Sequence, residues 1–371
     1  MLYTAMFVYI LLNGWFSKHI RGSAENKQRW LIITCFILLF IVSGCRFQTG
    51  AKSDIYRNYM HTYSAALRSW ADVFTISKEF LHGILRKIII EVFRDPQAYF
   101  FITAAFIVGV ALITIKKYSN DVFLGILLYF VWGGYFASNN VTRQYIAITI
   151  GLIAIKYIIE EKPPQFAVCM ILAMGFHASA VVLIPLYFLS KTAFNKNILI
   201  IYALLAAVLV VLNGPVTRLM QIFLYSDYGA GYGTESSNVL RLVWPLIVFF
   251  FLVVINRNKY QCSPAVLGNN PRQIELFNNL ICHGSILYIY FSLLSAVNML
   301  MFSRVAAYYS QYALFCMTFG IDASNSRRNR KLLKVGVWTL SFLWFIAMNC
   351  TGKYIPTPYT PFWKYPLRLL P

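Results

Sequence analysis

Two polar side chains in otherwise apolar sequence, Arg143 and His177, are the residues best suited to chemistry. Arg143 lies in the polar stretch 139–147, and His177 lies in Gly175-Phe-His-Ala-Ser179, with a long apolar run between them. A charged side chain near the centre of a bilayer costs about 2.5–3.5 kcal/mol on insertion scales, so it needs a compensating role. Either residue alone can be structural, because an arginine can snorkel to an interface and a histidine can be satisfied inside a core. Together they predict a polar cavity within a membrane protein.

The composition is that of a polytopic membrane protein. Of the 371 residues, 59% are hydrophobic and 12% are charged, and the mean hydropathy is +0.60, whereas a soluble domain carries about 25% charged residues. Apolar runs recur along the whole chain, and a bilayer is crossed by about 17–25 such residues. The sequence therefore predicts one all-α transmembrane domain over residues 1–371, with about 10–12 transmembrane helices.

The formal net charge of +20 resides mainly in loops beside the predicted spans. Short basic loops stay cytoplasmic, which places residues 18–29, 256–272 and 327–334 inside and the N-terminus outside. Membrane orientation and anionic lipid explain this charge, so nucleic acid is not an expected partner. Residues 46–97 and 213–238 then form outer-face loops. The first contains an amphipathic helix over 74–93, which is expected at the membrane surface or packed over the bundle.

One apolar segment has to be broken to satisfy this topology. Seven apolar runs separate the first two basic loops, and an odd number cannot connect two loops on the same side. We predict that residues 165–189 form a broken, re-entrant hairpin, because Gly175, His177, Ser179 and Pro185 weaken a continuous helix there. In the alternative, the helix over 74–93 crosses the membrane, which its charges disfavour. The sequence shows no second broken segment and no internal repeat.

Several charged residues fall at or just inside the outer half of the membrane in this topology; they are Arg46, Asp54, Arg143, Arg241 and Arg304. Guanidinium groups match phosphate oxygens and keep their charge, so a lipid phosphate is the expected ligand. On a continuous helix, Asn139, Arg143 and Ala147 share one face, with Gln144 adjacent. His177 and Asp54 are the two candidate general bases.

Cofactor chemistry has no support in the sequence. The motifs HExxH, GxSxG, the P-loop and the dinucleotide fingerprint are absent. The seven cysteines form no CxxC pair and show no metal-ligand spacing. We therefore expect no cofactor and no metal ion.

The order of the polar motifs resembles the EpsG/Wzy-like family of polysaccharide repeat-unit polymerases. The matching pieces are Arg46 before Asp54-x-Tyr56, Ser-Asn-Asn-x-x-Arg-Gln-x-x-Ala over 138–147, Phe-His-Ala-Ser-Ala over 176–180, Arg304-x-x-x-Tyr308 and a proline- and tyrosine-rich tail. The resemblance covers nearly the whole chain. Its most specific part is the Arg-Gln motif followed by the Phe-His-Ala-Ser motif.

The resemblance implies a GT-C-like glycosyltransferase of the bacterial plasma (inner) membrane, with its active site facing the periplasm or exterior. Such an enzyme joins undecaprenyl-diphosphate-linked oligosaccharide repeats into O-antigen, capsule or exopolysaccharide. A hydroxyl of one lipid-linked repeat attacks the anomeric carbon of the growing chain, and undecaprenyl diphosphate leaves without the help of a metal. The implied partners are the lipid-linked donor and acceptor, the lipid bilayer and a chain-length regulator.

The catalytic candidates are His177, Asp54 and Arg143. The substrate-binding candidates carry guanidinium, amide or phenol groups; they are Arg46, Arg304, Arg241, Asn139, Gln144, Tyr145, Tyr56 and Tyr308. The basic stretch 57–94 has no role that the resemblance assigns. Two other functions stay open: a flippase or transporter of lipid-linked oligosaccharide, which also needs a cationic cavity, and a membrane O-acyltransferase, which also needs a histidine.

Overall fold

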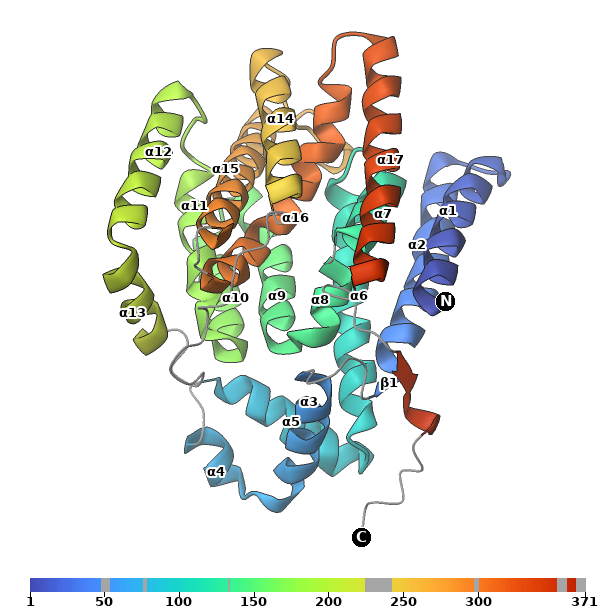
Figure 1. Cartoon of the computed structure of the whole chain (residues 1–371), viewed down its shortest axis with the longest axis vertical. Helices are drawn as coiled ribbons and strands as arrows, with labels where there is room; N and C mark the ends of the chain where they lie inside the picture. Colours follow the sequence, from blue (N-terminus) through green and yellow to red (C-terminus); the bar gives the residue numbers. More distant parts are fainter. Residues whose placement is uncertain are drawn as a thin grey trace.

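The computed structural model describes residues 1–47, 54–75, 79–132, 134–223, 242–296, 300–351 and 359–364. Most of these residues form a bundle of helices that run along one axis, and a smaller helical layer lies across one end of the bundle (Figure 1). In the described residues, strands β1 (Arg46–Phe47) and β2 (Thr360–Pro361) form the only sheet, an antiparallel pair. The predicted all-α fold is confirmed.

The chain forms the first two helices of the bundle, then the layer, and then the rest of the bundle. The bundle comprises α1 (Leu2–His19), α2 (Ala24–Gly44), α6 (Gln97–Tyr118), α7 (Val122–Val131), α8 (Gly134–Asn140), α9 (Thr142–Ile159), α10 (Pro163–Phe176), α11 (Pro185–Leu189), α12 (Lys196–Val211), α13 (Asn213–Phe223), α14 (Val243–Arg257), α15 (Pro271–Ala296), α16 (Leu300–Asp322) and α17 (Arg327–Thr351). The layer comprises α3 (Asp54–Ser64), α4 (Trp70–Thr75) and α5 (Phe80–Phe93). Short 3-10 helices are η1 (Ala65–Leu67), η2 (Ala178–Leu183), η4 (Ala265–Leu267) and η5 (Phe362–Lys364).

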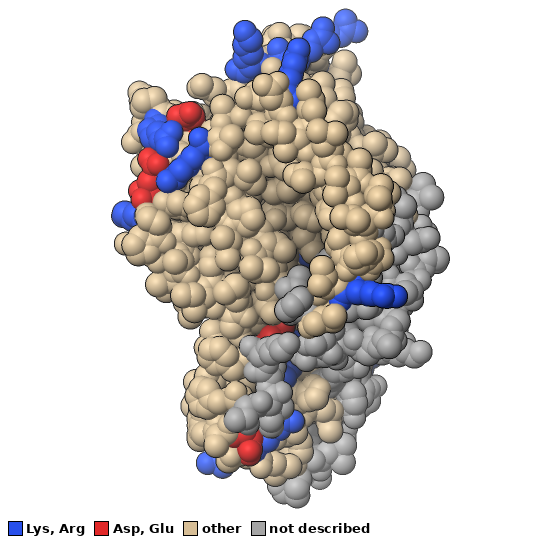
Figure 2. Space-filling model, turned by 90° about the vertical axis from the view of Figure 1, so that its left-hand side faces the viewer, with Lys and Arg blue, Asp and Glu red and all other residues tan. Residues whose placement is uncertain are grey.

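The bundle has the dimensions and surface of a multi-pass membrane protein. Five of the described helices are each long and apolar enough to cross a membrane; they are α2, α6, α9, α15 and α17. The bent pair of α7 and α8 is a sixth candidate if it forms one span. Figure 2 shows Lys and Arg gathered at the end opposite the α3–α5 layer, above a band with almost no charged atoms. The predicted total of 10–12 spans requires shorter helices to cross as well, and it stays a prediction.

The segment after α9 returns to the end of the bundle from which it starts. Helix α10 ends at Phe176, His177 has an extended backbone with φ −157° and ψ 114°, and the chain turns back through η2 and α11 (Figure 1). Nζ of Lys191, beyond α11, lies 3.7 Å from Oε1 of Glu161, which precedes α10. The predicted broken hairpin is therefore present, with its break at His177, and its re-entry within the membrane stays a prediction.

A second break was not expected from the sequence, which predicts one continuous span over 122–136. Helices α7 and α8 are instead bent by 45° relative to each other, where two consecutive glycines at 133 and 134 destabilise a helix. A further interruption at Val141 separates α8 from α9. Asn139 and Arg143 consequently belong to different helices, so the prediction that they share one helical face is wrong. Serine and asparagine at 138–140 favour such an end because their side chains compete for backbone hydrogen bonds.

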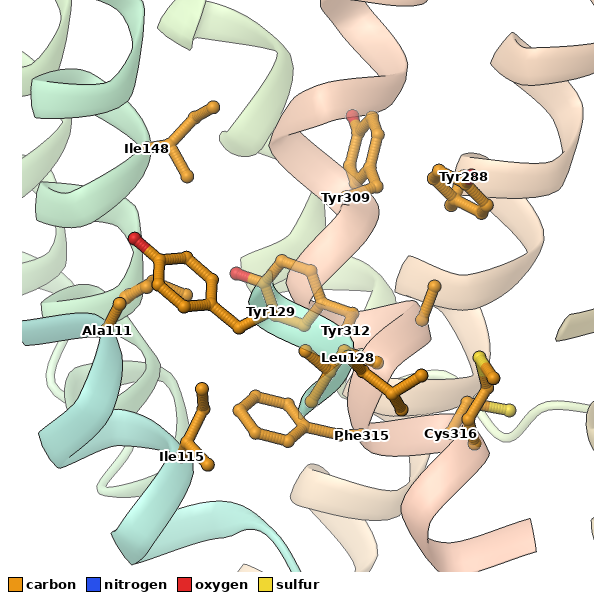
Figure 3. Packing of buried hydrophobic residues seen from close by; sticks show 14 of the residues in the cluster. Ala111, Ile115, Leu128, Tyr129, Ile148, Tyr288, Tyr309, Tyr312, Phe315 and Cys316 are labelled. Atoms are coloured by element: carbon orange, nitrogen blue, oxygen red, sulfur yellow. The ribbon is translucent and has the colours of Figure 1, made fainter. Parts of the chain in front are cut away.

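The core of the bundle is aromatic and closely packed. Buried aromatic side chains fill the space between α6 and α16 (Figure 3). They are Tyr129 from α7 and Tyr312 and Phe315 from α16. Ile115 on α6 closes the other side of this group (Figure 3). Such packing fixes the relative positions of α6, α7 and α16. It thereby also positions the ends of these helices that lie nearest the α3–α5 layer, where the polar motifs lie.

Helix α5 packs over the end of the bundle, and its buried residues are both polar and apolar, with Ile89 and Ile90 among them. Its polar residues His82 and Lys87 are buried, whereas Ile88, Val92 and Phe93 are exposed. The segment predicted as one amphipathic helix over 74–93 is thus divided into α4 and α5, and the buried residues of α5 include polar side chains as well as isoleucines. Buried polar groups need hydrogen-bond partners. A residue of α6 is the hydrogen-bond partner of His82.

Candidate active site

Arg143 and His177 contact the same carboxylate. Nη1 of Arg143 lies 2.5 Å from Oε2 of Glu79, and Nδ1 of His177 donates a hydrogen bond to Oε1 of Glu79. Glu79 immediately precedes α5 and is 6% exposed. The bundle and the α3–α5 layer therefore meet at a buried ionic group, which we call the Glu79 cluster (Glu79, Arg143 and His177).

The break in the hairpin positions His177 for this contact. Because α10 stops at Phe176, the backbone N–H of Ala178 is free of the helix and donates a hydrogen bond to Glu79. Gly175 brings the two segments together, since a Cβ at this position would lie 2.5 Å from Cδ1 of Leu81 on α5. A glycine at this position therefore permits the close approach of α5 to α10.

Substitution of Gly175 by valine should separate α5 from α10 and weaken the Glu79–His177 contact. The clash is with a flexible leucine side chain, so we expect the protein to fold with a loss of stability of about 1–3 kcal/mol, as in overpacked cores. Hydrogen–deuterium exchange should show faster exchange in residues 80–93 and unchanged exchange in α15. Gly336→Val is the matched control, because no atom lies within 4 Å of a Cβ at that position. Equal protection of α5 in both variants would contradict this account.

The Glu79 carboxyl is held in its charged form. Burial by itself raises the pKa of Glu79, but the hydrogen bond and charge of His177, together with the charge of Arg143, outweigh burial and leave the pKa below its ordinary value. Nε2 of His177 is buried and has no hydrogen-bond partner among the described residues. The charge that His177 contributes to the shift in the pKa of Glu79 is that of the imidazolium; in the neutral imidazole the proton belongs on Nδ1, which faces the carboxylate. Nε2 then presents a lone pair that can accept a proton.

The next turns of α5 extend the polar contact surface. Nε2 of His82 lies 2.7 Å from the hydroxyl of Tyr99 at the start of α6, and the Arg86 guanidinium lies 5.7 Å from the centre of the Tyr99 ring. Arg86 also donates a hydrogen bond to Asn58 on α3. Burial, together with nearby cationic groups such as Arg86, places the pKa of His82 well below its ordinary value, so this imidazole is neutral. Burial lowers the pKa of Arg86 to about 10, which still leaves it charged at neutral pH.

Sequence reasoning assigned no role to residues 57–94 and missed Glu79, His82 and Arg86. Their spacing of three and four residues is a usable signal, because it places them on one side of a helix. Apolar residues recur at a similar spacing in the same segment, and the prediction of an amphipathic helix was based on them. In the structure, Glu79 and His82 are buried together with apolar residues of α5.

Arg46 lies at the junction of α2, α9 and the C-terminal segment. Its Nη2 lies 3.3 Å from Oγ1 of Thr142, its Nη1 donates to the carbonyl of Ser43, and its guanidinium lies 4.8 Å from the centre of the Phe100 ring. Its backbone pairs with Pro361 in the small sheet. No described carboxylate forms an ion pair with Arg46, and Nε has no hydrogen-bond partner among the described residues. Burial lowers its pKa to about 10, so Arg46 also stays charged.

The remaining motifs converge on the start of α9. Nε2 of Gln144 donates a 2.6 Å hydrogen bond to the backbone carbonyl of Arg304, and the hydroxyls of Tyr308 and Ser179 lie 3.0 Å apart. Asn139 accepts a hydrogen bond from the hydroxyl of Ser43. Segments that are far apart in the sequence are thus joined by side-chain contacts.

Other predicted site residues have different positions. Tyr145 lies on the opposite side of α9 from Arg143, where it lines a cavity inside the bundle. The side chains of Asp54 and Tyr56, and all of Arg241, lie outside the described residues. In the part of the chain that the structure describes, no three His, Cys, Asp or Glu side chains are grouped to hold a metal ion. The expectation that no metal is needed stays a prediction.

Fold and site together define a multi-pass α-helical membrane protein with a charged cluster at one end of its bundle. The sequence model of the EpsG family matches residues 29–366, and the chain therefore belongs to the EpsG family. Searches of curated proteins and of solved structures gave no match. The matched region contains every motif on which the predicted family resemblance rests, so that prediction is confirmed.

Proposed function

We propose that this protein is a polysaccharide polymerase, a glycosyltransferase that joins undecaprenyl-diphosphate-linked oligosaccharide repeats and releases undecaprenyl diphosphate. Membership of the EpsG family supports a polymerase in general. The single observation that carries the specific proposal is the Glu79 cluster, a histidine held by a carboxylate beside arginines. Transfer from a lipid diphosphate needs a base for the acceptor and positive charge for the leaving group, and this cluster supplies both.

In the proposed reaction, His177 is the general base. The acceptor hydroxyl attacks the anomeric carbon of the donor chain, a new glycosidic C–O bond forms, and the bond between that carbon and the diphosphate oxygen breaks. The hydroxyl proton passes to Nε2 of His177. Glu79 holds the imidazole through Nδ1 and stabilises the imidazolium that forms. Nε2 is buried in the structure, so the α3–α5 layer has to move aside when the acceptor binds.

The arginines stabilise the diphosphate. Arg143 is the accessible member of the group, with a side chain that is 29% exposed. Arg46 contacts the adjacent residue Thr142, and Arg86 is close enough to Arg143 to interact with it electrostatically. Arg46 and Arg86 form no ion pair among the described residues, and Glu79 interacts electrostatically with both Arg86 and Arg143, so the region around Glu79 carries excess positive charge. Arg304, Arg241, Asp54 and Tyr56 remain candidates for the same surface.

The charge distribution supports an active site on the outer face of the bacterial plasma membrane. The basic loops 18–29, 256–272 and 327–334 lie at the end of the bundle opposite the α3–α5 layer (Figure 1). Such loops stay in the cytoplasm. The Glu79 cluster then faces the periplasm or exterior, where the lipid-linked repeats are assembled in this proposal.

Reconstitution into liposomes with a purified lipid-linked repeat unit tests this function. A polymerase produces a ladder of lengthened chains on a gel and releases undecaprenyl diphosphate. A flippase moves the lipid between leaflets without lengthening it, and the second broken helix pair, α7 and α8, is a feature that transporters also have. An acyltransferase adds the mass of an acyl group. Either of the last two results would replace the proposed function.

Substitution of Arg143 by lysine should reduce lengthening about tenfold to a hundredfold. Lysine keeps the charge but cannot make the paired hydrogen bonds of a guanidinium to a carboxylate or phosphate. The initial rate of release of undecaprenyl diphosphate is the measurement. Lys156→Arg on the same helix is the control, since Lys156 pairs with Glu160 at the other end of α9. An unchanged rate in Arg143→Lys would contradict the proposal that Arg143 makes paired hydrogen bonds to a carboxylate or phosphate during the reaction.

A further inference from the structure

We propose that the cavity inside the bundle binds a neutral sugar ring of the lipid-linked oligosaccharide. This inference rests on the proposed function and locates the saccharide within it. The cavity measures about 250 Å³ and lies between α7, α8, α9 and α14–α17. It is smaller than the about 300–1,000 Å³ of most ligand pockets, so it accommodates one ring rather than a whole repeat unit.

One wall of the cavity consists of aromatic rings. The indoles of Trp132 and Trp244 stack with centroids 5.2 Å apart, Tyr288 meets Trp132 edge-on at 5.1 Å, and Trp344 meets Trp244 at 5.7 Å. The Nε1 of Trp132 donates to the hydroxyl of Tyr288, which fixes both rings. The faces of such rings carry partial negative charge and attract the weakly positive C–H groups of a sugar.

The facing side of the cavity is polar but uncharged. It carries hydroxyl and amide groups from α15 and α16; these residues are Ser292, Ser295, Ser303, Ser310 and Gln311. Oε1 of Gln311 and Nε1 of Trp244 are buried and have no hydrogen-bond partner among the described residues, and the two residues are 4% and 3% exposed. Buried polar atoms normally have partners. Both residues line the cavity, and a ligand with several hydroxyl groups can supply a donor to the first atom and an acceptor to the second once the side chains turn toward it.

Sugar fits these features better than the other parts of the substrate. An isoprenoid chain has no hydrogen-bonding group and would leave both orphan atoms unpaired, at a cost in free energy. The diphosphate needs cations, and none of the described residues that line the cavity is charged. The cavity is also close to the Glu79 cluster, because Tyr145 lines it while Arg143 belongs to the cluster. The cluster and the cavity therefore lie on opposite sides of the same turn of α9, one residue to either side of Gln144.

The test compares two lipids on the full-length protein in nanodiscs. One is the lipid-linked repeat extracted from producing cells, and the other is undecaprenyl diphosphate without sugar. In Trp244→Phe and Gln311→Leu, affinity for the glycosylated lipid should fall about tenfold, as expected for a buried hydrogen bond, with no change for the sugar-free lipid. Trp338→Phe is the matched control, because its buried Nε1 also lacks a described partner but lies outside the cavity.

The outcomes separate this inference from the proposed function. Gln311→Leu removes an unpaired buried atom, so thermal stability should be kept or raised while sugar binding falls. If the affinity for both lipids falls equally, the cavity binds the lipid chain or the diphosphate instead of the sugar. If the affinity for both lipids is unchanged, the cavity binds neither lipid. Each of these results would overturn the inference. Binding requires no turnover. Loss of glycosylated-lipid affinity in an inactive protein would therefore keep the sugar site and reject the polymerase.

Discussion

Substitution of His177 by glutamine should slow chain lengthening by about a hundredfold to ten-thousandfold, the range that a general base contributes. Glutamine can still donate a hydrogen bond to Glu79, so the contact between the bundle and the α3–α5 layer is kept. It cannot accept the acceptor proton, because an amide is a very weak base. The rate of polymer formation from purified lipid-linked repeats, under single-turnover conditions, measures the chemical step.

The matched control is His283→Gln. His283 is also a buried histidine of the bundle; its ring nitrogens lie 2.9 Å from the hydroxyl of Tyr202 and 3.0 Å from the carbonyl of Thr192, away from the Glu79 cluster. Its substitution should change the rate only as far as it lowers the amount of folded protein. If His177→Gln and His283→Gln are equally active per folded molecule, His177 is not the base.

Substitution of Glu79 by glutamine should have an effect of similar size, about a thousandfold. The corresponding carboxylate-to-amide change in the Ser-His-Asp triad lowers kcat about 10⁴-fold because it selects the wrong tautomer of the histidine. In this protein the change also removes the charge that balances Arg143. The single-turnover rate and the pH–rate profile are the measurements, and the profile should change because the imidazolium loses its counter-ion.

Glu91→Gln is the control for this substitution. Glu91 belongs to α5, its side chain is 44% exposed, and it pairs at 2.9 Å with Lys87, whose side chain is 7% exposed. Loss of this pair takes one partner from a buried ammonium, so we expect some loss of stability. Glu91 is not part of the Glu79 cluster, so the rate per folded molecule should stay close to that of the wild type. A Glu79→Gln variant that matches Glu91→Gln in both rate and pH profile would show that the carboxylate has only a structural role.

The sequence predicted those features that depend on local chemistry. The all-α membrane fold followed from apolar runs and low charge. The break at His177 followed from a glycine, a histidine, a serine and a proline within one apolar segment, together with the charge of the flanking loops. In the structure, Lys191 contacts Glu161 across the two ends of this hairpin, as the predicted topology requires.

The features that were missed depend on contacts between distant segments. Glu79 acquires its partners from α9 and α10, and no local pattern specifies that a carboxylate at the start of α5 meets Arg143 and His177. The interruption at Val141, in contrast, has a local signal in the serine and asparagines at 138–140, and Asn139 also accepts a hydrogen bond from Ser43. A four-residue spacing indicates a shared face only where the helix is continuous, and between Asn139 and Arg143 it is not.

The most direct test of the central claim is an experimental structure with undecaprenyl diphosphate bound in a lipid nanodisc. If the Glu79 cluster is the reaction centre, the phosphate groups should lie within hydrogen-bond distance of the Arg143 guanidinium, on the side of the membrane that contains α5. Phosphate groups located among the basic loops at the opposite end of the bundle, with the Glu79 cluster unchanged and empty, would contradict it.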